Sequence, residues 1–176
     1  MNRIVGFPPI LGDRPRVLIL GSMPSVASLE KYQYYAKPQN AFWRIMGELF
    51  GAGPDLPYEQ RTELLKKQGI AVWDVLASCE RPGSLDSAIK MQTATANDFA
   101  ALLLEQPGIA HVFFNGKKAE EVFQKRSLAA VEQVRPELKF TSLPSTSPAM
   151  ASLCFEDKLL QWQSVYRVLS GADPVG

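Results

Sequence analysis

The run Val17-Leu18-Ile19-Leu20, which leads into Gly21, decides the fold class of this chain. A short apolar run with no alternating polar residues is typical of a strand that is buried on both faces. Such strands occur almost only in parallel sheets that helices cover on both sides. The run therefore predicts a buried strand of an α/β domain, with a glycine at its exit.

Segments of alternating type extend outward from this strand. Further strands are predicted at residues 70–76, 110–114 and 138–143. Helices are predicted at residues 40–50, 58–68, 97–106, 116–126 and 155–169, with Asn97 as an N-cap. Residues 1–14 and 171–176 are expected to be irregular. This alternation predicts a parallel sheet covered on both faces, in one domain that spans residues 1–176 with its core at about 15–170.

The composition excludes several classes of protein. With 46% hydrophobic and 21% charged residues, the chain of 176 residues is suited to a globular domain. It has no apolar run near the roughly 20 residues of a membrane helix, and its N-terminus lacks the pattern of a signal peptide. Cys79 and Cys154 are too few and too distant for a disulfide framework. We therefore expect a cytoplasmic protein with no membrane partner. At a net charge of +1, a nucleic-acid partner would need a local basic patch.

Ligands of such sheets bind outside the carboxyl ends of the strands. That edge is predicted to hold four segments, at residues 21–40, 74–87, 115–118 and 144–152. The first begins with GSMPS (21–25), where the glycine permits close approach of a ligand and the proline stiffens the loop. GSMPS lacks the spacing of a phosphate-binding or dinucleotide-binding loop, so an ordinary strand-to-helix turn is the alternative.

Aromatic and amide side chains gather in YQYYAKPQNAFW, residues 32–43. Aromatic rings can stack on a nucleobase, and amides offer paired donors and acceptors. Phe42 and Trp43 fit a helix core equally well, and Asn40 fits a helix N-cap. Three tyrosines in one loop, by contrast, favour a binding role.

The segment LPSTSPAMAS, residues 143–152, joins the last predicted strand to the last helix. Its two prolines make a stiff loop, and its hydroxyl groups and backbone amides are suited to holding a phosphodiester. An ordinary connection between two elements is the alternative.

Taken together, GSMPS, QYYAKPQNAFW, WDVLASCERPGSLDSAI, FFNGKKA and LPSTSPAMA resemble the motifs of the uracil-DNA glycosylase superfamily. Within it, the chain resembles the hypoxanthine-DNA glycosylase branch, also called DNA-deoxyinosine glycosylases. The likeness spans about residues 15–168, and the order and spacing of the motifs make it specific. It implies a three-layer α/β/α sandwich around a four-stranded parallel sheet. It also implies an enzyme that removes a flipped, deaminated base from double-stranded DNA.

The resemblance further implies catalytic roles for Asn40, Ser22 and Ser145. In the hypoxanthine branch the catalytic asparagine lies in the PxN segment, which is Asn40 here. Ser22 and Met23 occupy the place where many superfamily members carry a catalytic Asp or Asn. Ser145 occupies the place of a His or Asn that stabilises the leaving base. These departures argue against efficient removal of uracil.

Asn40 is expected to orient the water that hydrolyses the N-glycosidic bond, in a monofunctional reaction. A Schiff base on Lys37 is the alternative. The residues expected to contact the flipped base are Gly21, Met23, Tyr34, Tyr35, Phe42, Asp74 and Asn115. For Asn115 the alternative is a helix cap, and for Asp74 it is an ion pair or a loop hydrogen bond.

The residues expected to contact the DNA backbone or groove are Pro24, Ser25, Lys117, Lys118, Ser147, Pro148, Ala149 and Met150. Met150 or its neighbour is expected to fill the gap that the flipped base leaves, as apolar wedges do. Lys117 and Lys118 lie at a helix start, where backbone amides also attract phosphate, and Arg81 is a second basic candidate. A solvated charged face is the alternative for these cations.

Hypoxanthine is the favoured base. The alternatives are a mismatch-type uracil or thymine glycosylase, a lesion-binding protein with little or no turnover, and a hydrolase of free nucleosides. One histidine, His111, and two cysteines argue against a metal site or an iron–sulfur cluster. We expect a monomer without a cofactor, in which His111 is packed or lies on the surface.

Overall fold

The centre of the computed structural model, which describes residues 3–171, is a parallel sheet with the strand order β3-β2-β6-β7. Its strands are β2 (Val17–Gly21), β3 (Ile70–Asp74), β6 (His111–Asn115) and β7 (Lys139–Leu143). β2 pairs with β3 on one side and with β6 on the other, and all five of its residues are buried. The predicted parallel sheet is confirmed. The remaining terminal residues of the predicted domain, 1–2 and 172–176, lie outside the described part.

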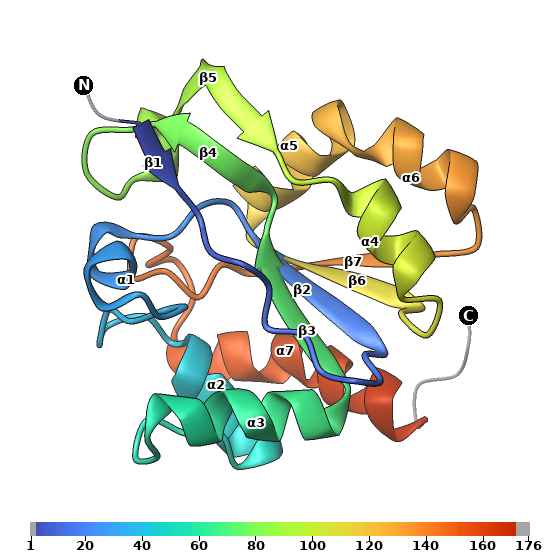
Figure 1. The fold of residues 1–176 in the computed structure, drawn as a ribbon. Coiled ribbons are helices and arrows are strands. Elements are labelled where there is room, and N and C mark those ends of the chain that lie inside the picture. The colour runs from blue at the N-terminus through green and yellow to red at the C-terminus, as the bar shows by residue number, and fades with distance from the viewer. Residues whose placement is uncertain (1–2, 172–176) are drawn as a thin grey trace.

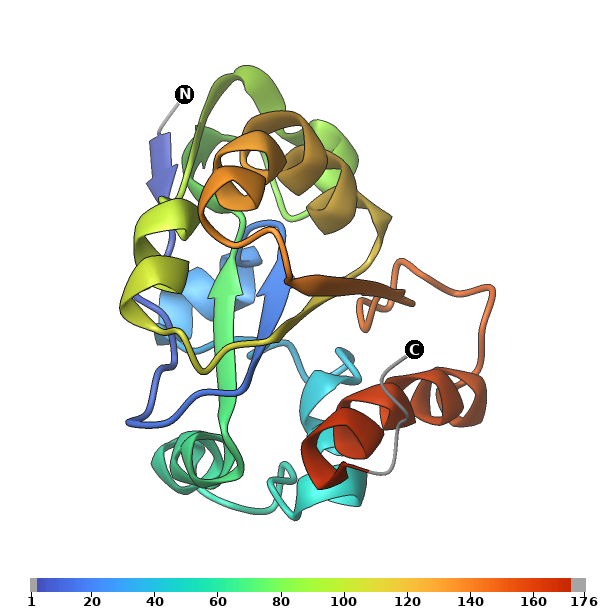
Figure 2. The same ribbon diagram turned by 90° about the vertical axis from the view of Figure 1, so that its right-hand side faces the viewer.

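Helices cover both faces of this sheet (Figure 1, Figure 2). One face carries α2 (Phe42–Phe50), α3 (Tyr58–Gln68) and α7 (Phe155–Ser170). The other face carries α4 (Phe99–Glu105), α5 (Lys117–Arg126) and α6 (Leu128–Val134). Because successive side chains of a strand point to opposite faces, Val17 and Ile19 pack with the first set, and Leu18 and Leu20 pack with the second. The three-layer α/β/α architecture is thus confirmed.

The first turn of α4 differs from the expectation. The helix is capped by Asp98, whose side chain accepts a hydrogen bond from the backbone N–H of Ala101 at 3.0 Å. Asn97, the predicted cap, donates instead from Nδ2 to the backbone carbonyl of Asp74 at 2.8 Å. Asn97 therefore ties the start of α4 to the carboxyl end of β3.

A second, antiparallel sheet stands beside the first and was not predicted. It has the order β1-β4-β5, from β1 (Arg3–Val5), β4 (Leu76–Glu80) and β5 (Lys90–Ala96). The predicted strand 70–76 is divided at Val75, whose N–H donates to the Gly21 carbonyl at 2.8 Å. The lead-in expected to be irregular contains β1, and the Arg3 guanidinium spans the small sheet to the hydroxyls of Ser78 and Thr95.

The chain after β2 forms a short helix, α1 (Val26–Lys31), which Ser25 caps by accepting from the N–H of Ser28 at 3.2 Å. Tyr32 and Tyr35 then adopt left-handed backbone conformations, each with φ near 54°. The carboxyl edge of the parallel sheet, toward the left of Figure 1, thus holds α1, the 32–41 loop and the 144–150 loop. None of the helices within residues 3–171 is long and apolar enough to cross a membrane.

Candidate active site

A cavity of about 390 Å³ opens at the carboxyl edge of the parallel sheet. This volume lies in the usual range of ligand pockets. All four segments predicted for that edge contribute to its wall. The lining residues are Gly21, Ser22, Met23, Pro24, Ser25, Ser28, Tyr35, Lys37, Asn40, Asp74, Ser84, Leu85, Asp86, Ser87, Asn115, Ser145, Thr146, Ser147, Pro148, Ala149 and Met150. Loops that are up to 129 positions apart in the chain, from 21 to 150, therefore meet around one hollow.

Gly21 leaves the room that this cavity needs. A Cβ atom at this position would lie 2.6 Å from Oδ1 of Asp74 and 2.8 Å from the hydroxyl of Tyr35. Both distances are too short for real contacts, so only glycine leaves both groups where they are. The carboxyl of Asp74 and the hydroxyl of Tyr35 therefore converge over the last residue of β2.

Asp74 is a buried acid with an unused oxygen. Its side chain is 4% exposed, and among the described residues its Oδ2 has no hydrogen-bond partner. Burial raises the pKa of Asp74 to about 7, the nearby charge of Asp86 adds to the rise, and Arg81 opposes it. Buried polar atoms are almost always paired, so a buried carboxyl that lines a cavity and has an unpaired oxygen is a candidate ligand contact.

The hydroxyl of Tyr35 is in a similar position. It is buried and makes no hydrogen bond of normal geometry within residues 3–171. Burial and the charge of Asp74 raise the pKa of Tyr35 well above its ordinary value, while the side chain of Asn115 opposes the rise. Tyr35 is therefore neutral at physiological pH and can donate its proton to a ligand.

Asn40 lines the cavity beside the start of α2. Its Oδ1 accepts from the N–H of Phe42 at 2.9 Å, so the side chain caps α2 although the N-cap position itself is Ala41. The cap interpretation and a catalytic role are compatible. An amide oxygen has a second lone pair, and the amide NH₂ adds two donors, so Asn40 retains polar capacity for the cavity.

The 144–150 loop is fixed to the sheet through Asn115. Nδ2 of Asn115 donates to Oγ1 of Thr146 at 3.0 Å, and the N–H of Thr146 donates back to Oδ1 at 2.9 Å. The carbonyl of Thr146 accepts from the N–H of Ala41 at 2.9 Å, which joins the loop to α2 as well. Asn115 is thus not a helix cap, because the cap position of α5 is Gly116. It lines the cavity, and its amide retains a second N–H beyond the bond to Thr146, so contact with a base remains a prediction.

The two predicted catalytic serines both line the cavity, and each has a local partner. The hydroxyl of Ser22 donates to Oδ1 of Asp86 at 2.5 Å. Oγ of Ser145 accepts from the N–H of Ser147 at 3.1 Å, inside the turn of its own loop. Gly116, at φ 97°, passes so close that a Cβ there would lie 3.0 Å from Cβ of Ser145.

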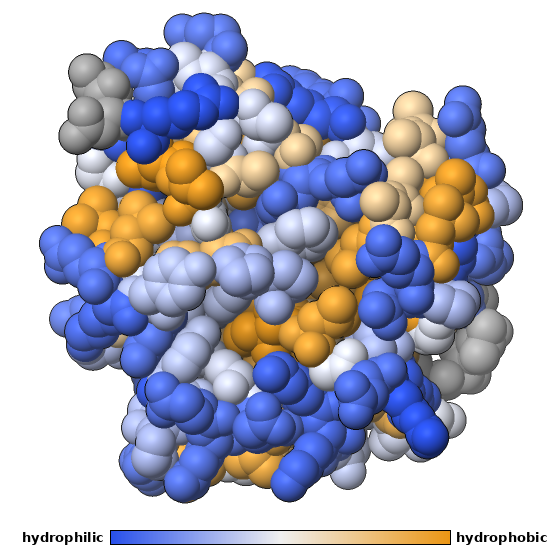
Figure 3. All heavy atoms as spheres, in the orientation of Figure 1, coloured by the Kyte–Doolittle hydropathy of each residue, from blue (hydrophilic) through white to orange (hydrophobic). Residues whose placement is uncertain are grey.

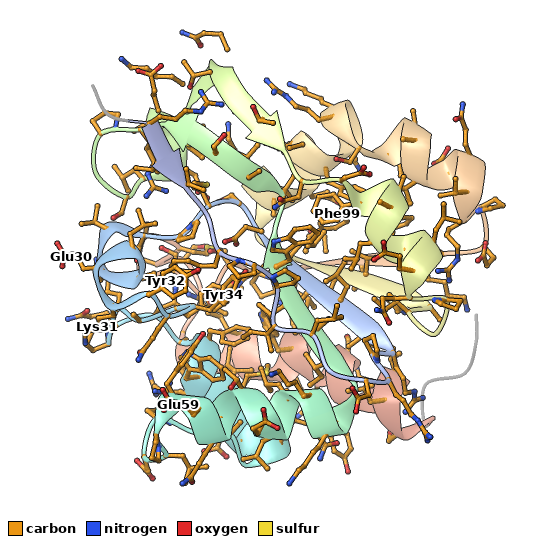
Figure 4. All side chains as sticks on the ribbon, in the orientation of Figure 1. Glu30, Lys31, Tyr32, Tyr34, Glu59 and Phe99 are labelled. Carbon is orange, nitrogen blue, oxygen red and sulfur yellow. The ribbon has the colours of Figure 1, made fainter. Side chains whose placement is uncertain are left out.

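Tyr34 and Phe42, two predicted base contacts, lie outside the cavity lining. Phe42 is fully buried behind Tyr35, and the two stacked rings lie 4.1 Å apart. The hydroxyl of Tyr34, which is labelled in Figure 4, donates to the backbone carbonyl of Pro8 at 2.9 Å. The ring of Phe7 packs edge-on against that of Tyr34. The role of both residues is therefore corrected from base contact to packing: Phe42 stacks behind Tyr35, and Tyr34 belongs to the core beside it. Trp43 is likewise core, as its alternative interpretation proposed.

The predicted cations are distributed differently from the expectation. Arg81 is buried, and its guanidinium donates to the carbonyls of Pro24 and Gly83, so its role is structural and it does not face DNA. Lys117 and Lys118 lie outside the lining, on the first turn of α5. Lys37, in contrast, is exposed and lines the cavity.

Part of the wall comes from the β4–β5 connection, residues 81–89, in which Arg81 was the only residue predicted individually. Ser84, Leu85, Asp86 and Ser87 all line the cavity. The segment 74–87 was predicted at the correct edge, and the motif WDVLASCERPGSLDSAI spans it, but no role was predicted for Leu85 or Asp86. The contact between Asp86 and Ser22 depends on the antiparallel sheet that local sequence patterns did not predict.

His111 lies at the opposite end of β6, stacked on Phe113 with ring centroids 4.3 Å apart. Its Nε2 lies 2.7 Å from Oγ1 of Thr141. The packed interpretation describes it well. Within residues 3–171 no group of three or more His, Cys, Asp or Glu side chains is arranged to hold a metal ion.

Comparisons with known proteins agree on one family. The model of the family described as "Uracil DNA glycosylase superfamily" matches residues 8–166. A hypoxanthine DNA glycosylase of Methanosarcina acetivorans is 36% identical over 164 residues, which cover 92% of this chain and 97% of the relative. One of Methanosarcina barkeri is 40% identical over 117 residues, which cover 66% and 73%. A solution NMR structure from M. acetivorans, described as a candidate uracil DNA glycosylase, superposes with a TM-score of 0.77 at 34% identity, over 96% of this chain and 99% of that one.

Proposed function

The chain belongs to the uracil DNA glycosylase superfamily and is a DNA glycosylase, and from this premise we propose that it removes hypoxanthine from DNA as a monofunctional enzyme. The reaction is hydrolysis of the N-glycosidic bond of a nucleotide flipped out of the duplex. We also propose that residues 1–176 act as a single domain and as a monomer, because one sheet edge of one chain supplies the whole described wall of the cavity.

The observation that carries the proposal is the meeting of the Asp74 carboxyl and the Tyr35 hydroxyl over Gly21. Oδ1 of Asp74 lies nearest the glycine, while its Oδ2 and the Tyr35 hydroxyl have no hydrogen-bond partner among the described residues. A deaminated base presents a ring N–H beside a carbonyl oxygen. Oδ2 of Asp74 is suited to accept from that N–H, and the hydroxyl of Tyr35 is suited to donate to that oxygen. Adenine presents the reverse order, a ring nitrogen acceptor beside an amino donor. A site built for one order rejects the other strongly, because mismatched groups would remain buried and unpaired.

Two features favour hypoxanthine over uracil. Both relatives described above carry hypoxanthine in their names. The hydroxyls of Ser22 and Ser145, which replace the usual catalytic side chains of the superfamily, are engaged with Asp86 and Ser147. The chain therefore has fewer groups to stabilise a departing uracil.

The chemical step needs an oriented water and stabilised charge. Asn40 supplies the orientation, because its amide borders the cavity and retains hydrogen-bonding capacity beyond its bond to Phe42. An amide is a weak base, but it is sufficient where the leaving base departs readily. A polar group of this kind in a water-poor site contributes on the order of 3 kcal/mol, or about a hundredfold in rate.

Lys37 supports a second candidate function, because it is exposed and lines the same cavity. A lysine amine that reaches C1′ can form a Schiff base and lead to strand cleavage. Borohydride trapping separates the two mechanisms: a covalent protein–DNA product requires the amine, whereas a hydrolase yields none.

The deciding experiment uses labelled duplexes that carry inosine, uracil, xanthine or unmodified adenine at one position. After incubation, alkali cleaves the strand wherever a base has been removed. We expect cleavage at inosine only after alkali, a weaker signal at uracil, and none at adenine. Strand cleavage without alkali would replace the hydrolase with the lyase. Binding without cleavage of any duplex would contradict the proposed activity, as would activity on free inosine nucleoside alone.

A further inference from the structure

Leu85 is an exposed leucine at the mouth of the cavity. Leu85 is 58% exposed, and it lines the cavity as part of the β4–β5 connection. Single exposed hydrophobic residues are common on protein surfaces and need no explanation by themselves. The backbone around this one, however, is fixed in a way that surface loops seldom require.

Both neighbours of Leu85 are fixed to the segment that follows β2. Oγ of Ser84 accepts from the N–H of Val26 at 2.9 Å, and Oδ1 of Asp86 accepts from the hydroxyl of Ser22 at 2.5 Å. The carbonyl of Leu85 itself accepts from the N–H of Ala88 at 3.0 Å, in a turn that leads into the 3-10 helix Asp86–Ala88. The side chains of Ser84 and Asp86 are therefore bonded to the segment after β2, while the side chain of Leu85 is left exposed.

The base of the connection is fixed as well. The buried guanidinium of Arg81 donates to the carbonyl of Pro24 at 2.5 Å and to that of Gly83 at 2.7 Å. Gly83 has φ 71°, a conformation that favours glycine and turns the chain sharply before Leu85. The loop is thus held against the Ser22–Val26 segment at three points, through Ser22, Pro24 and Val26, and the backbone on both sides of Leu85 is fixed.

We infer that Leu85 inserts into the base stack of double-stranded DNA beside the flipped nucleotide. Apolar side chains that act as wedges unstack a base step and fill the gap left by the extrahelical base. A wedge held by a rigid loop loses little conformational entropy on binding. A second exposed apolar residue, Val26, lies close by: it is 41% exposed, and its N–H is bonded to Ser84, the neighbour of Leu85. Figure 3 shows hydrophobic surface over α1 and the β4–β5 connection. This inference rests on the proposed function, since it assumes a flipped base in the cavity.

Leu85 fits this task better than Met150, the residue first expected to be the wedge. Met150 is only partly exposed, and its sulfur accepts from the hydroxyl of Ser152 at 3.1 Å. Both residues line the cavity, so the 144–150 loop retains a place in DNA binding. The wedge itself is assigned to the other loop.

The test compares Leu85→Ala with Leu104→Ala. Leu104 is equally exposed, at 58%, but it belongs to α4 and does not line the cavity, so it is a matched control. Flipping costs a few kcal/mol, so loss of a wedge should slow single-turnover excision from an inosine duplex by at least about tenfold. Leu85→Met should restore most of the rate, and Leu104→Ala should match the parent. A rate for Leu85→Ala within twofold of the parent would overturn the inference.

A second readout separates this inference from the proposed function. 2-Aminopurine beside the lesion becomes fluorescent when its stacking is broken. The parent should raise this fluorescence on binding, and Leu85→Ala should not, although both bind. If the parent excises no base, the proposed function fails while this measurement still decides whether Leu85 is a wedge. Equal fluorescence with Leu85→Ala and with the parent would refute it.

Discussion

At the scale of single residues, the structure holds Asp74 where its charge costs folding free energy. The carboxyl is buried, the charge of Asp86 lies near it, and one of its oxygens is unpaired. Strongly perturbed acids of this kind cluster at functional sites. The hydroxyl of Tyr35 meets the same carboxyl over Gly21. The free-energy cost of burying the charge of Asp74 therefore arises at the place where we propose that the base is recognised.

Replacement of Asp74 by Asn should change how stability depends on pH. The folded pKa of about 7 lies above the ordinary value of 3.8, so between these values the folded state binds more protons than the unfolded state. The free energy of unfolding of the parent therefore falls as pH rises through that window, by up to about 1.4 kcal/mol per pH unit. Asn does not titrate, so Asp74→Asn should be the more stable protein at pH 8, by a margin that disappears toward pH 4.

Urea denaturation at pH 4, 6 and 8 measures this margin. The exposed Asp55 supplies the control, since Asp55→Asn changes the same atoms at a solvated position. A stability difference between parent and Asp74→Asn that is constant with pH would show that Asp74 is ionised without penalty. Excision from an inosine duplex should also be slower with Asp74→Asn. The amide has one acceptor oxygen in place of two, and its NH₂ donor can face the ring N–H of the base.

Asn40 leads to a prediction about rate. Asn40→Ala should reduce excision on the order of a hundredfold and leave DNA affinity nearly unchanged, because the proposed role of the side chain is to orient the water and not to bind phosphate. Loss of the bond to the N–H of Phe42 should also cost about 1 kcal/mol of stability. Asn40→Asp retains an oxygen at that place and should recover the stability. Single-turnover rates and thermal melting separate the two effects, and a rate within a few fold of the parent for Asn40→Ala would remove Asn40 from catalysis.

At the scale of elements, local patterns predicted the parallel sheet and five of the helices, but not α1, α6 or the antiparallel sheet. Val17–Gly21 is apolar throughout, and the helices have regular apolar spacing, so short windows of sequence were sufficient. β1 pairs Arg3 with Glu80, and β4 meets β5 with irregular register, so those strands depend on distant partners. For the same reason the sequence placed Asn40 and Asp74 at the site but missed Leu85 and Asp86. Tyr34 was misplaced because the left-handed turns at Tyr32 and Tyr35 direct its ring into the core.

The two hydrogen bonds between Asn115 and Thr146 should determine the order of the 144–150 loop. Asn115→Ala leaves the hydroxyl and N–H of Thr146 buried without these partners, at a cost of about 1–3 kcal/mol. Hydrogen exchange in residues 144–150 should rise, and excision should fall with it. Thr146→Ser retains both partners and should resemble the parent. If excision falls in Asn115→Ala while the loop stays protected, Asn115 contacts the base directly.

At the scale of the whole molecule, the chain is nearly neutral, with 19 Lys and Arg against 18 Asp and Glu. Attraction to DNA must therefore come from the local placement of Lys and Arg side chains, because they exceed the acidic side chains by only one. The cavity, the 144–150 loop and the start of α5 all lie at one edge of the parallel sheet, on which Lys37, Lys117 and Lys118 are placed. A DNA duplex laid across that edge would meet cations and helix-start amides together.

This arrangement predicts that Lys117 contributes equally to the binding of damaged and undamaged duplexes. Lys117→Ala should weaken binding of inosine-containing and undamaged duplexes by the same factor, because a phosphate contact carries no sequence information. The slope of log affinity against log salt should become shallower by about one, the effect of a single phosphate contact. Lys67→Ala removes an exposed cation from the last turn of α3, which lies on another side of the molecule (Figure 1), and should leave the slope unchanged. Titrations at several salt concentrations measure both, and a loss confined to the damaged duplex would place Lys117 in lesion recognition instead.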